Sequence, residues 1–125
     1  MKIIMLVGLP GSGKTHYGES LGLPFYDDLT QTGGLKAIEP ADAIIISDFS
    51  LIFEKQRRVA EKVLKTKFPN AKIEYVVWEN NPEACWKNIV RRKDTKNIAR
   101  EFLHFASRHY TSPKKMKELL PVYEG

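Results

Sequence analysis

A stretch of eight residues carries the clearest chemical pattern in the chain. Residues 8–15 read Gly-Leu-Pro-Gly-Ser-Gly-Lys-Thr, which fits G-x-x-x-x-G-K-[ST] at every fixed position. Glycine allows backbone torsions that other side chains forbid, so successive N–H groups can converge on phosphate oxygens. The pattern therefore predicts a phosphate-binding loop, in which Lys14 neutralises β- and γ-phosphate charge and Thr15 offers its hydroxyl to Mg²⁺. The predicted nucleotide-binding residues of the loop are Gly8, Pro10, Gly11, Ser12, Gly13, Lys14 and Thr15.

A second candidate for the metal is Asp48. It follows the apolar run Ile44-Ile45-Ile46-Ser47, and an Asp at the end of a buried strand is the second acidic position of such nucleotide sites. Asp48 also precedes an expected helix, and Asp is a good helix cap. We predict a metal role for Asp48, with capping as the alternative.

Transfer of a phosphoryl group to an alcohol also requires a carboxylate that orients and deprotonates the acceptor. Asp27 and Asp28 end an expected strand, and strand ends are where ligands bind in open α/β sheets. Both are candidates for this base. The alternative is that the pair merely begins a turn.

Two arginines follow one another near the end of a predicted helix. Arg91 and Arg92 would each deliver a guanidinium that stabilises charge on the transferred phosphoryl oxygens. The alternative is that both belong to the solvated face of the helix. We predict that they contact the nucleotide phosphates.

Alternating strand and helix patterns must position these groups. Apolar runs typical of buried strands alternate with apolar residues at helical spacing. Expected strands cover residues 2–7, 24–27, 43–47 and 72–78, and expected helices cover 14–21, 53–67, 82–93, from 97 or 98 to 110, and 113–120. This order predicts an α/β domain with a mainly parallel sheet of about four strands, flanked by helices.

The composition sets further limits. The chain has 125 residues, 42% of them apolar and 28% charged, with a single cysteine, Cys85. These values exclude a disordered tail, a collagen-like repeat and a disulfide scaffold, and we expect one domain over residues 1–125. The longest uncharged apolar stretch, residues 3–10, is far shorter than the roughly 20 residues of a membrane span. We expect a cytoplasmic protein with no targeting segment and no membrane partner.

Charge is distributed unevenly along the chain. Residues 1–54 contain three lysines and seven acidic residues, a balance of −4, whereas residues 55–125 contain 17 basic and eight acidic residues, a balance of +9. An anionic partner would be steered toward the second part, and both ATP and nucleic acid are such anions. Lysine-rich surfaces also serve solubility, so charge alone does not choose a partner.

With these motifs in place, the sequence resembles the P-loop kinases, most closely the 5′-hydroxyl kinase domain of phage-type polynucleotide kinases. The matching segments are residues 8–15, Phe25-Tyr26, Asp27-Asp28, Ile45-Ile46-Ser47-Asp48, Arg57-Arg58, Asn88 with Arg91, and Pro121-Val122-Tyr123-Glu124-Gly125. The resemblance implies a three-layer, nucleotide-kinase-like P-loop NTPase fold with a lid over about residues 86–100, and ATP and Mg²⁺ as cofactors. It also implies Asp27 as the general base and Arg91 as the lid arginine.

The resemblance further implies that the γ-phosphate of ATP is transferred to the 5′-hydroxyl of a polynucleotide or nucleic-acid fragment. In that family an arginine shortly after the base helps to hold the phosphate of the acceptor strand, but here no Arg precedes Arg57. Arg57 and Arg58 are therefore the candidates for acceptor binding. Two alternatives remain: a kinase of a nucleoside, nucleotide or other small alcohol, and a nucleotide-binding module without acceptor chemistry.

Overall fold

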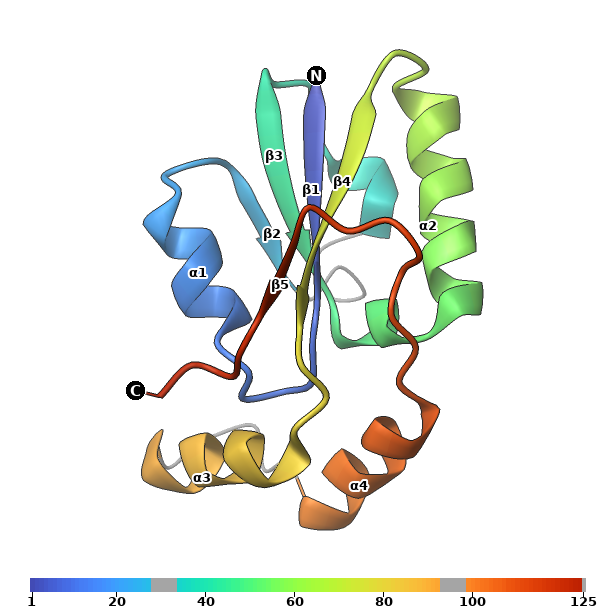
Figure 1. The fold of residues 1–125 in the computed structure, drawn as a ribbon. Coiled ribbons are helices and arrows are strands. Elements are labelled where there is room, and N and C mark those ends of the chain that lie inside the picture. The colour runs from blue at the N-terminus through green and yellow to red at the C-terminus, as the bar shows by residue number, and fades with distance from the viewer. Residues whose placement is uncertain (28–33, 93–98, 125) are drawn as a thin grey trace.

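Five parallel strands form the central sheet in the computed structural model, which describes residues 1–27, 34–92 and 99–124 (Figure 1). The strands are β1 (Lys2–Val7), β2 (Phe25–Asp27), β3 (Ala43–Ser47), β4 (Lys72–Trp78) and β5 (Glu118–Leu120). Their order in the sheet is β2-β3-β1-β4-β5, and each neighbouring pair is parallel. The α/β class and the parallel sheet are as predicted, with one strand more than expected.

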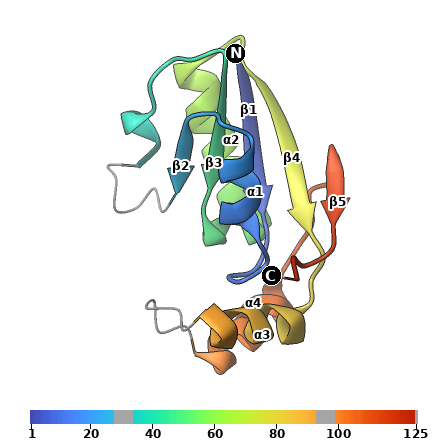
Figure 2. The same ribbon diagram turned by 90° about the vertical axis from the view of Figure 1, so that its left-hand side faces the viewer.

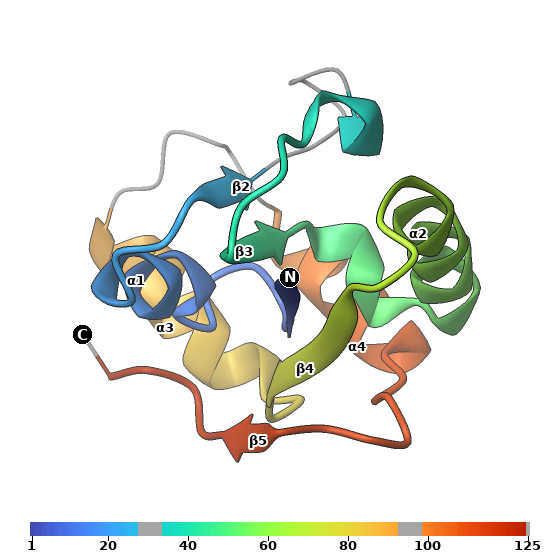
Figure 3. The ribbon, with the colours of Figure 1, turned by 90° about the horizontal axis from the view of Figure 1, so that it is seen from above.

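Helices enclose the sheet on three sides. Helix α1 (Lys14–Ser20) lies on one face and α2 (Glu54–Lys67) on the other, as the view from above shows (Figure 3). Helices α3 (Pro82–Arg92) and α4 (Arg100–His109) lie beyond the carboxyl ends of the strands (Figure 2). The 3₁₀ turns η1 (Gly34–Ala37) and η2 (Phe49–Ile52) complete the elements. In the part of the chain that the structure describes, no helix combines the length and apolar character needed to cross a membrane.

The core follows the alternation of side chains along β1. Ile3, Met5 and Val7 belong to the larger apolar cluster, which includes Leu64 of α2. Ile4 and Leu6 point to the other face and join a smaller cluster, against which Tyr17 of α1 packs. Successive side chains of a strand point to opposite faces, so an uninterrupted apolar run is what a strand covered on both faces requires.

The predicted short helix over residues 113–120 is wrong. Residues 118–120 form β5 instead, which pairs with the edge of β4 in the register Val76↔Glu118, Val77↔Leu119 and Trp78↔Leu120. The segment Lys-Glu-Leu-Leu has good helix propensity, but propensity is a weak preference that tertiary pairing overrides. Hydrogen bonding to the edge of β4 favours a strand over a helix for residues 118–120.

Tyr110, directly after α4, ties the last part of the chain to the carboxyl ends of two central strands. Its hydroxyl donates to the carbonyl of Trp78 at 2.6 Å and lies 3.3 Å from the carbonyl of Val7. Burial of this side chain raises the pKa of Tyr110 to about 12, so the phenol keeps its proton and remains a donor at neutral pH. The bond holds the chain beneath β1 and β4, where the phosphate loop begins.

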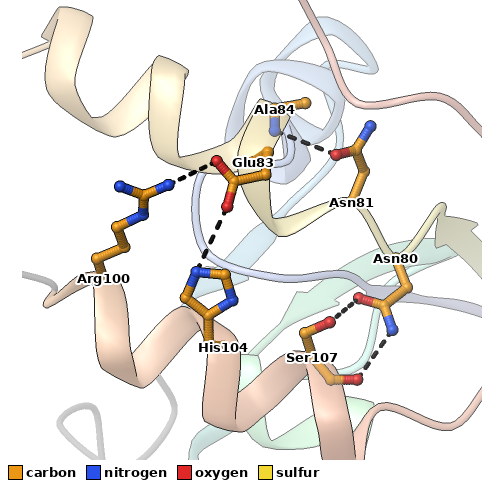
Figure 4. A network of polar contacts seen from close by, with 7 residues as sticks. All are labelled: Asn80, Asn81, Glu83, Ala84, Arg100, His104 and Ser107. Carbon is orange, nitrogen blue, oxygen red and sulfur yellow. Dashed lines mark hydrogen bonds and ion pairs between the residues drawn. The ribbon is translucent and has the colours of Figure 1, made fainter.

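A polar network joins the start of α3 to α4 (Figure 4). Glu83 accepts from Arg100 at 2.8 Å and lies 3.4 Å from the imidazole of His104. Asn80 donates to the carbonyl of Ser107 at 2.9 Å and accepts from its hydroxyl at 2.8 Å. These contacts link the two helices that flank residues 93–98.

Arg57 is a buried cation in the first turns of α2. Its side chain is 5% exposed, and its guanidinium donates to the carbonyl of Leu51 at 2.8 Å and to the carbonyl and hydroxyl of Thr111 at 2.7 and 3.2 Å. One side chain thus connects η2, α2 and the segment after α4. A buried charge is tolerated only when such hydrogen bonds replace its hydration.

Glu74 of β4 lies among three lysines. Its carboxylate oxygens are 3.4 Å from Lys117, 3.8 Å from Lys2 and 3.7 Å from Lys72. Burial by itself raises the pKa of Glu74, but the hydrogen bond and charge of Lys117 and the charges of Lys2 and Lys72 more than offset it, and the net pKa lies below the ordinary value. The ionised carboxylate therefore holds Lys117, just before β5, against the middle of the sheet.

We expect Arg57→Ala to lower the free energy of unfolding by about 2–4 kcal/mol, because it leaves the buried carbonyl of Leu51 and the part-buried carbonyl and hydroxyl of Thr111 without their donor. Arg58→Ala is the matched control. Arg58 is exposed and pairs only with Glu54 of the same helix turn at 2.7 Å among the described residues, and such pairs contribute about 0.3–0.5 kcal/mol. Urea denaturation of the two variants measures the difference, and equal losses would refute the structural role of Arg57.

We also expect the stability of the protein to depend on Glu74 in acid. Because the folded pKa is lowered from 4.5, the contribution is fully present above that ordinary value and is lost as the pH falls through the folded value. Glu74→Gln should therefore be less stable than the wild type at pH 7, and the two stability curves should converge as the pH falls below 4.5 and through the lowered pKa of the folded state. Urea titrations across this range test the prediction, and a constant difference at every pH would contradict it.

Candidate active site

The strand register brings three predicted parts of the site to one edge of the sheet. Leu6 of β1 pairs with Ser47 of β3, and Ser47 pairs on its other side with Asp27 of β2. Asp48 follows Ser47 directly, and the phosphate loop starts two residues after Leu6, at Gly8. The loop, Asp48 and Asp27 therefore leave adjacent parallel strands at the same carboxyl edge, where ligands of open α/β sheets bind.

The phosphate loop makes a tight turn that only glycine fits at two positions. Gly11 and Gly13 have φ values of 83° and 108°, in the left-handed region that glycine populates readily. A β-carbon at Gly11 would lie 2.6 Å from the carbonyl oxygen of Cys85, and one at Gly13 would lie 2.5 Å from Cβ of Tyr123. The glycines are required by packing as well as by torsion.

Lys14 folds back over the loop that precedes it. Its ammonium donates to the carbonyls of Gly8 at 2.6 Å and Leu9 at 3.0 Å. The positive charge thus lies beside the turn, on the inner side of the loop. A phosphate oxygen entering the loop would meet this ammonium and compete with the two carbonyls for it.

The polar groups of the loop fit the phosphates of a nucleotide. The hydroxyl of Ser12 is buried and has no hydrogen-bond partner among the described residues, and a buried polar group without a partner is unfavourable. Thr15 is exposed in the first turn of α1. A phosphate held by the loop would supply the acceptor that Ser12 lacks.

Asp48 has the capping role that was its alternative interpretation. Its Oδ1 accepts from the backbone N–H of Ser50 at 2.9 Å, and the residue is 8% exposed. The bond orients the carboxylate at the edge shared with the loop. Within the described residues no three acidic, His or Cys side chains form a metal cluster, so a metal here would take most of its ligands from nucleotide and water. The metal role of Asp48 and Thr15 stays a prediction.

Of the two predicted carboxylate bases, the structure describes one. Asp27 is half-buried at the end of β2, one strand away from Asp48. Asp28 lies outside the described residues, as does the part of the predicted lid over residues 93–98. Asp27 is therefore the candidate base whose position is known.

Helix α3 packs on the phosphate loop through its buried face. Cys85, Asn88 and Ile89 form this face. A β-carbon at Gly11 would lie 2.9 Å from Cγ1 of Ile89, in addition to its close approach to the carbonyl oxygen of Cys85. Burial raises the pKa of the Cys85 thiol to about 11, so Cys85 stays protonated and serves as a packing residue. The contact fixes where the end of α3 lies relative to the loop.

Arg92 continues the loop-facing side of α3. It follows Asn88 by four residues and Ile89 by three, the spacing of one helix face. Arg91 lies one residue, or about 100°, round the helix from it. Both are exposed at the end of α3. Helix geometry thus directs Arg92 toward the loop, whereas the family resemblance points to Arg91.

Arg57 and Arg58, the predicted acceptor-binding residues, do not join the loop. Arg57 occupies the structural position described above, with its guanidinium buried, and it also lines the groove beside α2; the acceptor-binding role of both arginines stays a prediction. Arg58 borders a groove of about 550 Å³ between α2, β4 and residues 112–117, which also contains Lys114 and Lys115. Sequence reasoning missed this burial because the partner, Thr111, is 54 residues away in the chain.

Sequence reasoning also missed how the end of the described chain contacts the loop. The N–H of Tyr123 donates to the carbonyl of Ser12 at 2.9 Å, and its ring stacks on His16 with the centroids 4.2 Å apart. Asn88 bonds to both segments. The only signal was that Asn88 and residues 121–125 were among the segments that carry the family resemblance.

The chain was compared with protein families, curated proteins and solved structures. No protein-family model matches the chain. It is 24% identical over 118 residues to an uncharacterized protein of Acanthamoeba polyphaga mimivirus, and the match covers 87% of this chain and 86% of that protein.

Two solved structures share the fold. A gluconokinase from Sinorhizobium meliloti has a TM-score of 0.60 over 99% of this chain and 84% of its own. A sugar kinase from a Janibacter species has a TM-score of 0.65 over 100% of this chain and 87% of its own. Each is 14% identical in sequence. The chain therefore has the P-loop nucleotide-kinase-like α/β fold, as predicted, while the narrower likeness to polynucleotide kinases stays a prediction.

Gly13→Ala should destabilise the protein more than an ordinary glycine substitution at positive φ. Gly22→Ala is the matched control, because Gly22 has a φ of +66° but nothing lies within 4 Å of its β-carbon position. We expect about 1 kcal/mol for Gly22→Ala from backbone strain and at least about 2 kcal/mol for Gly13→Ala, which also displaces Tyr123. Urea denaturation measures both, and equal values would show that Tyr123 does not constrain the loop.

Proposed function

We propose that the protein is an ATP- and Mg²⁺-dependent kinase that transfers the γ-phosphoryl group to the hydroxyl of a small alcohol. One observation carries the proposal: the register Leu6↔Ser47↔Asp27 puts a phosphate loop, an acidic cap and a second carboxylate on one edge of the sheet. A site for a triphosphate and a site for a base then lie side by side, which is what phosphoryl transfer requires.

On the donor side, the loop and Lys14 would bind the β- and γ-phosphates of ATP. Lys14 would exchange its bonds to the carbonyls of Gly8 and Leu9 for bonds to phosphate oxygens, which are stronger because both partners are charged. Thr15 and Asp48 would hold Mg²⁺, which when bound neutralises phosphate charge. Arg92, with Arg91 beside it, would stabilise the charge on the transferred group.

On the acceptor side, Asp27 would orient the attacking hydroxyl and take its proton. The hydroxyl oxygen forms a bond to the γ-phosphorus while the bond from that phosphorus to the β,γ-bridging oxygen breaks, and ADP leaves with the electron pair. Asp28 remains the alternative base. The half-buried position of Asp27 at the edge of the sheet suits a group that must meet both substrate and, after transfer, water.

Two observations support a small alcohol as the acceptor. Arg57, which was expected to hold the phosphate of a polynucleotide strand, is buried and already donates to three oxygens. The two solved structures with this fold are named as a gluconokinase and a sugar kinase, enzymes whose names indicate small acceptors.

A polynucleotide 5′-hydroxyl is the second candidate, and the groove beside α2 favours it. Arg58, Lys114, Lys115 and Lys117 line this groove together with Glu54, Glu61 and Glu74. Lysine and arginine side chains along a groove can follow a phosphodiester backbone. For such an acceptor, the nucleic-acid strand would run from the groove toward the phosphate loop.

The test is transfer of labelled γ-phosphate from ATP with Mg²⁺ to gluconate, to thymidine and to a 5′-hydroxyl oligonucleotide, measured side by side. We expect label on one of the two small alcohols. Lys14→Ala should lower the turnover by about 100-fold or more. Asp27→Asn should lower it by about 100-fold while the affinity for ATP is unchanged, because the base acts on the acceptor alone.

Each other outcome points elsewhere. Label on the oligonucleotide alone would replace the small alcohol by the second candidate. ATP binding without transfer to any hydroxyl, unaffected by Asp27→Asn, would leave a nucleotide-binding module. Transfer that persists in Lys14→Ala would refute the assigned site.

A further inference from the structure

Asn88 is a buried amide on α3 that bonds to two segments distant in sequence. It is 6% exposed. Its Nδ2 donates to the carbonyl of Gly11 at 2.9 Å and to the carbonyl of Tyr123 at 2.5 Å. An amide nitrogen carries two N–H donors, so both are used in linking the phosphate loop to the segment 121–124.

The segment 121–124 is itself fixed against the loop. The N–H of Tyr123 donates to the carbonyl of Ser12 at 2.9 Å, and the N–H of Val122 donates to Glu79 at 3.2 Å. The Tyr123 ring stacks on His16 of α1. The loop is thus held between α3 on one side and this segment on the other.

The two carbonyls that are held belong to successive peptide groups. The peptide group is planar and trans, so the N–H of Ser12 points away from the carbonyl of Gly11, and the N–H of Gly13 points away from the carbonyl of Ser12. Asn88 and the N–H of Tyr123 draw these carbonyls outward. The N–H of Ser12 accordingly points to the carbonyl of Leu9, to which it donates at 3.1 Å. Lys14 donates to the same carbonyl at 3.0 Å, so this N–H and the ammonium share one acceptor.

We infer that Asn88 is a positioning residue of the phosphate loop: together with the main chain of Tyr123 it sets the orientation of two successive peptide groups of the loop that would bind the nucleotide phosphates. The inference deepens the proposed function and rests on it for the identity of the ligand. The bonds themselves are independent of any ligand, so they can be tested without one.

The first measurement is amide hydrogen exchange of residues 8–15 in the absence of nucleotide. Asn88→Asp has nearly the same shape as the native side chain, but an ionised carboxylate donates no hydrogen bond to the two carbonyls. We expect exchange of the loop amides to be at least about tenfold faster in this variant and in Asn88→Ala. Tyr123→Pro, which removes the N–H that donates to Ser12, should have the same local effect.

Asn80→Ala is the matched control. Asn80 also makes two hydrogen bonds near the start of α3, to Ser107 of α4 (Figure 4), but it does not contact the loop in the described structure. We expect this variant to lower the melting temperature while leaving loop exchange unchanged. Unchanged exchange in the Asn88 variants, or an equal increase over the whole chain, would overturn the inference, because Asn88 would then be inert or merely structural.

The second measurement is the kinetics of the labelled-phosphate assay. Asn88→Asp should raise the KM for ATP by about tenfold and leave the KM for the acceptor unchanged, since only the phosphate-binding N–H groups lose their orientation. An equal change in both constants would contradict a positioning role. If the wild type transfers no phosphate, the proposed function fails. Faster amide exchange confined to the loop in the Asn88 variants would still establish that Asn88 positions the loop.

Discussion

The close fit of the phosphate loop between α3 and the segment 121–124 is the constraint on which the rest of the structure depends. There is no space for a β-carbon at Gly11, because Cys85 and Ile89 of α3 lie against it, or at Gly13, because Tyr123 does. The loop is thereby held from two sides by parts of the chain that are about 75 and 110 residues away. Its geometry is a tertiary property, although its sequence motif is only eight residues long.

Two side chains bring those distant parts to the loop. Tyr110 bonds to the carbonyls of Val7 and Trp78, at the carboxyl ends of β1 and β4. Arg57 bonds to Thr111 and Leu51, which fixes the next residue of the same segment against η2. From there the chain passes Lys117, which is held by Glu74, and enters β5. A polar side chain holds the chain at each step, so the final segment reaches the loop in a defined register.

The sequence predicted the elements whose signals are local. The apolar runs of β1 and β3 indicate burial on both faces of a sheet. The glycines of residues 8–15 indicate backbone torsions that other residues avoid and a close approach of the backbone to neighbouring groups. Asp27 and Asp48 could be placed on one edge because parallel strands end together. The metal and base roles of these residues stay predictions.

What the sequence could not predict depends on contacts between remote residues. Nothing in the sequence around Arg57 indicates burial, and its bonds to Thr111, 54 residues away, become visible only in the fold. Residues 118–120 have helix propensity, and only the edge of β4 makes them a strand. Asn88 is an ordinary polar residue of a helix until its two carbonyl partners are known. In each case a partner 30 to 80 residues away decides the role of the side chain.

The same distinction separates donor recognition from acceptor recognition in the proposed reaction. The phosphates of a nucleotide would be bound by backbone N–H groups and one lysine, so a donor site would depend mainly on the loop and its packing, which belong to the fold. An acceptor would be recognised by side chains around Asp27, which the fold does not specify. In the proposed reaction the fold would therefore supply the donor site, and the few side chains at the end of β2 would choose the hydroxyl that receives the phosphate.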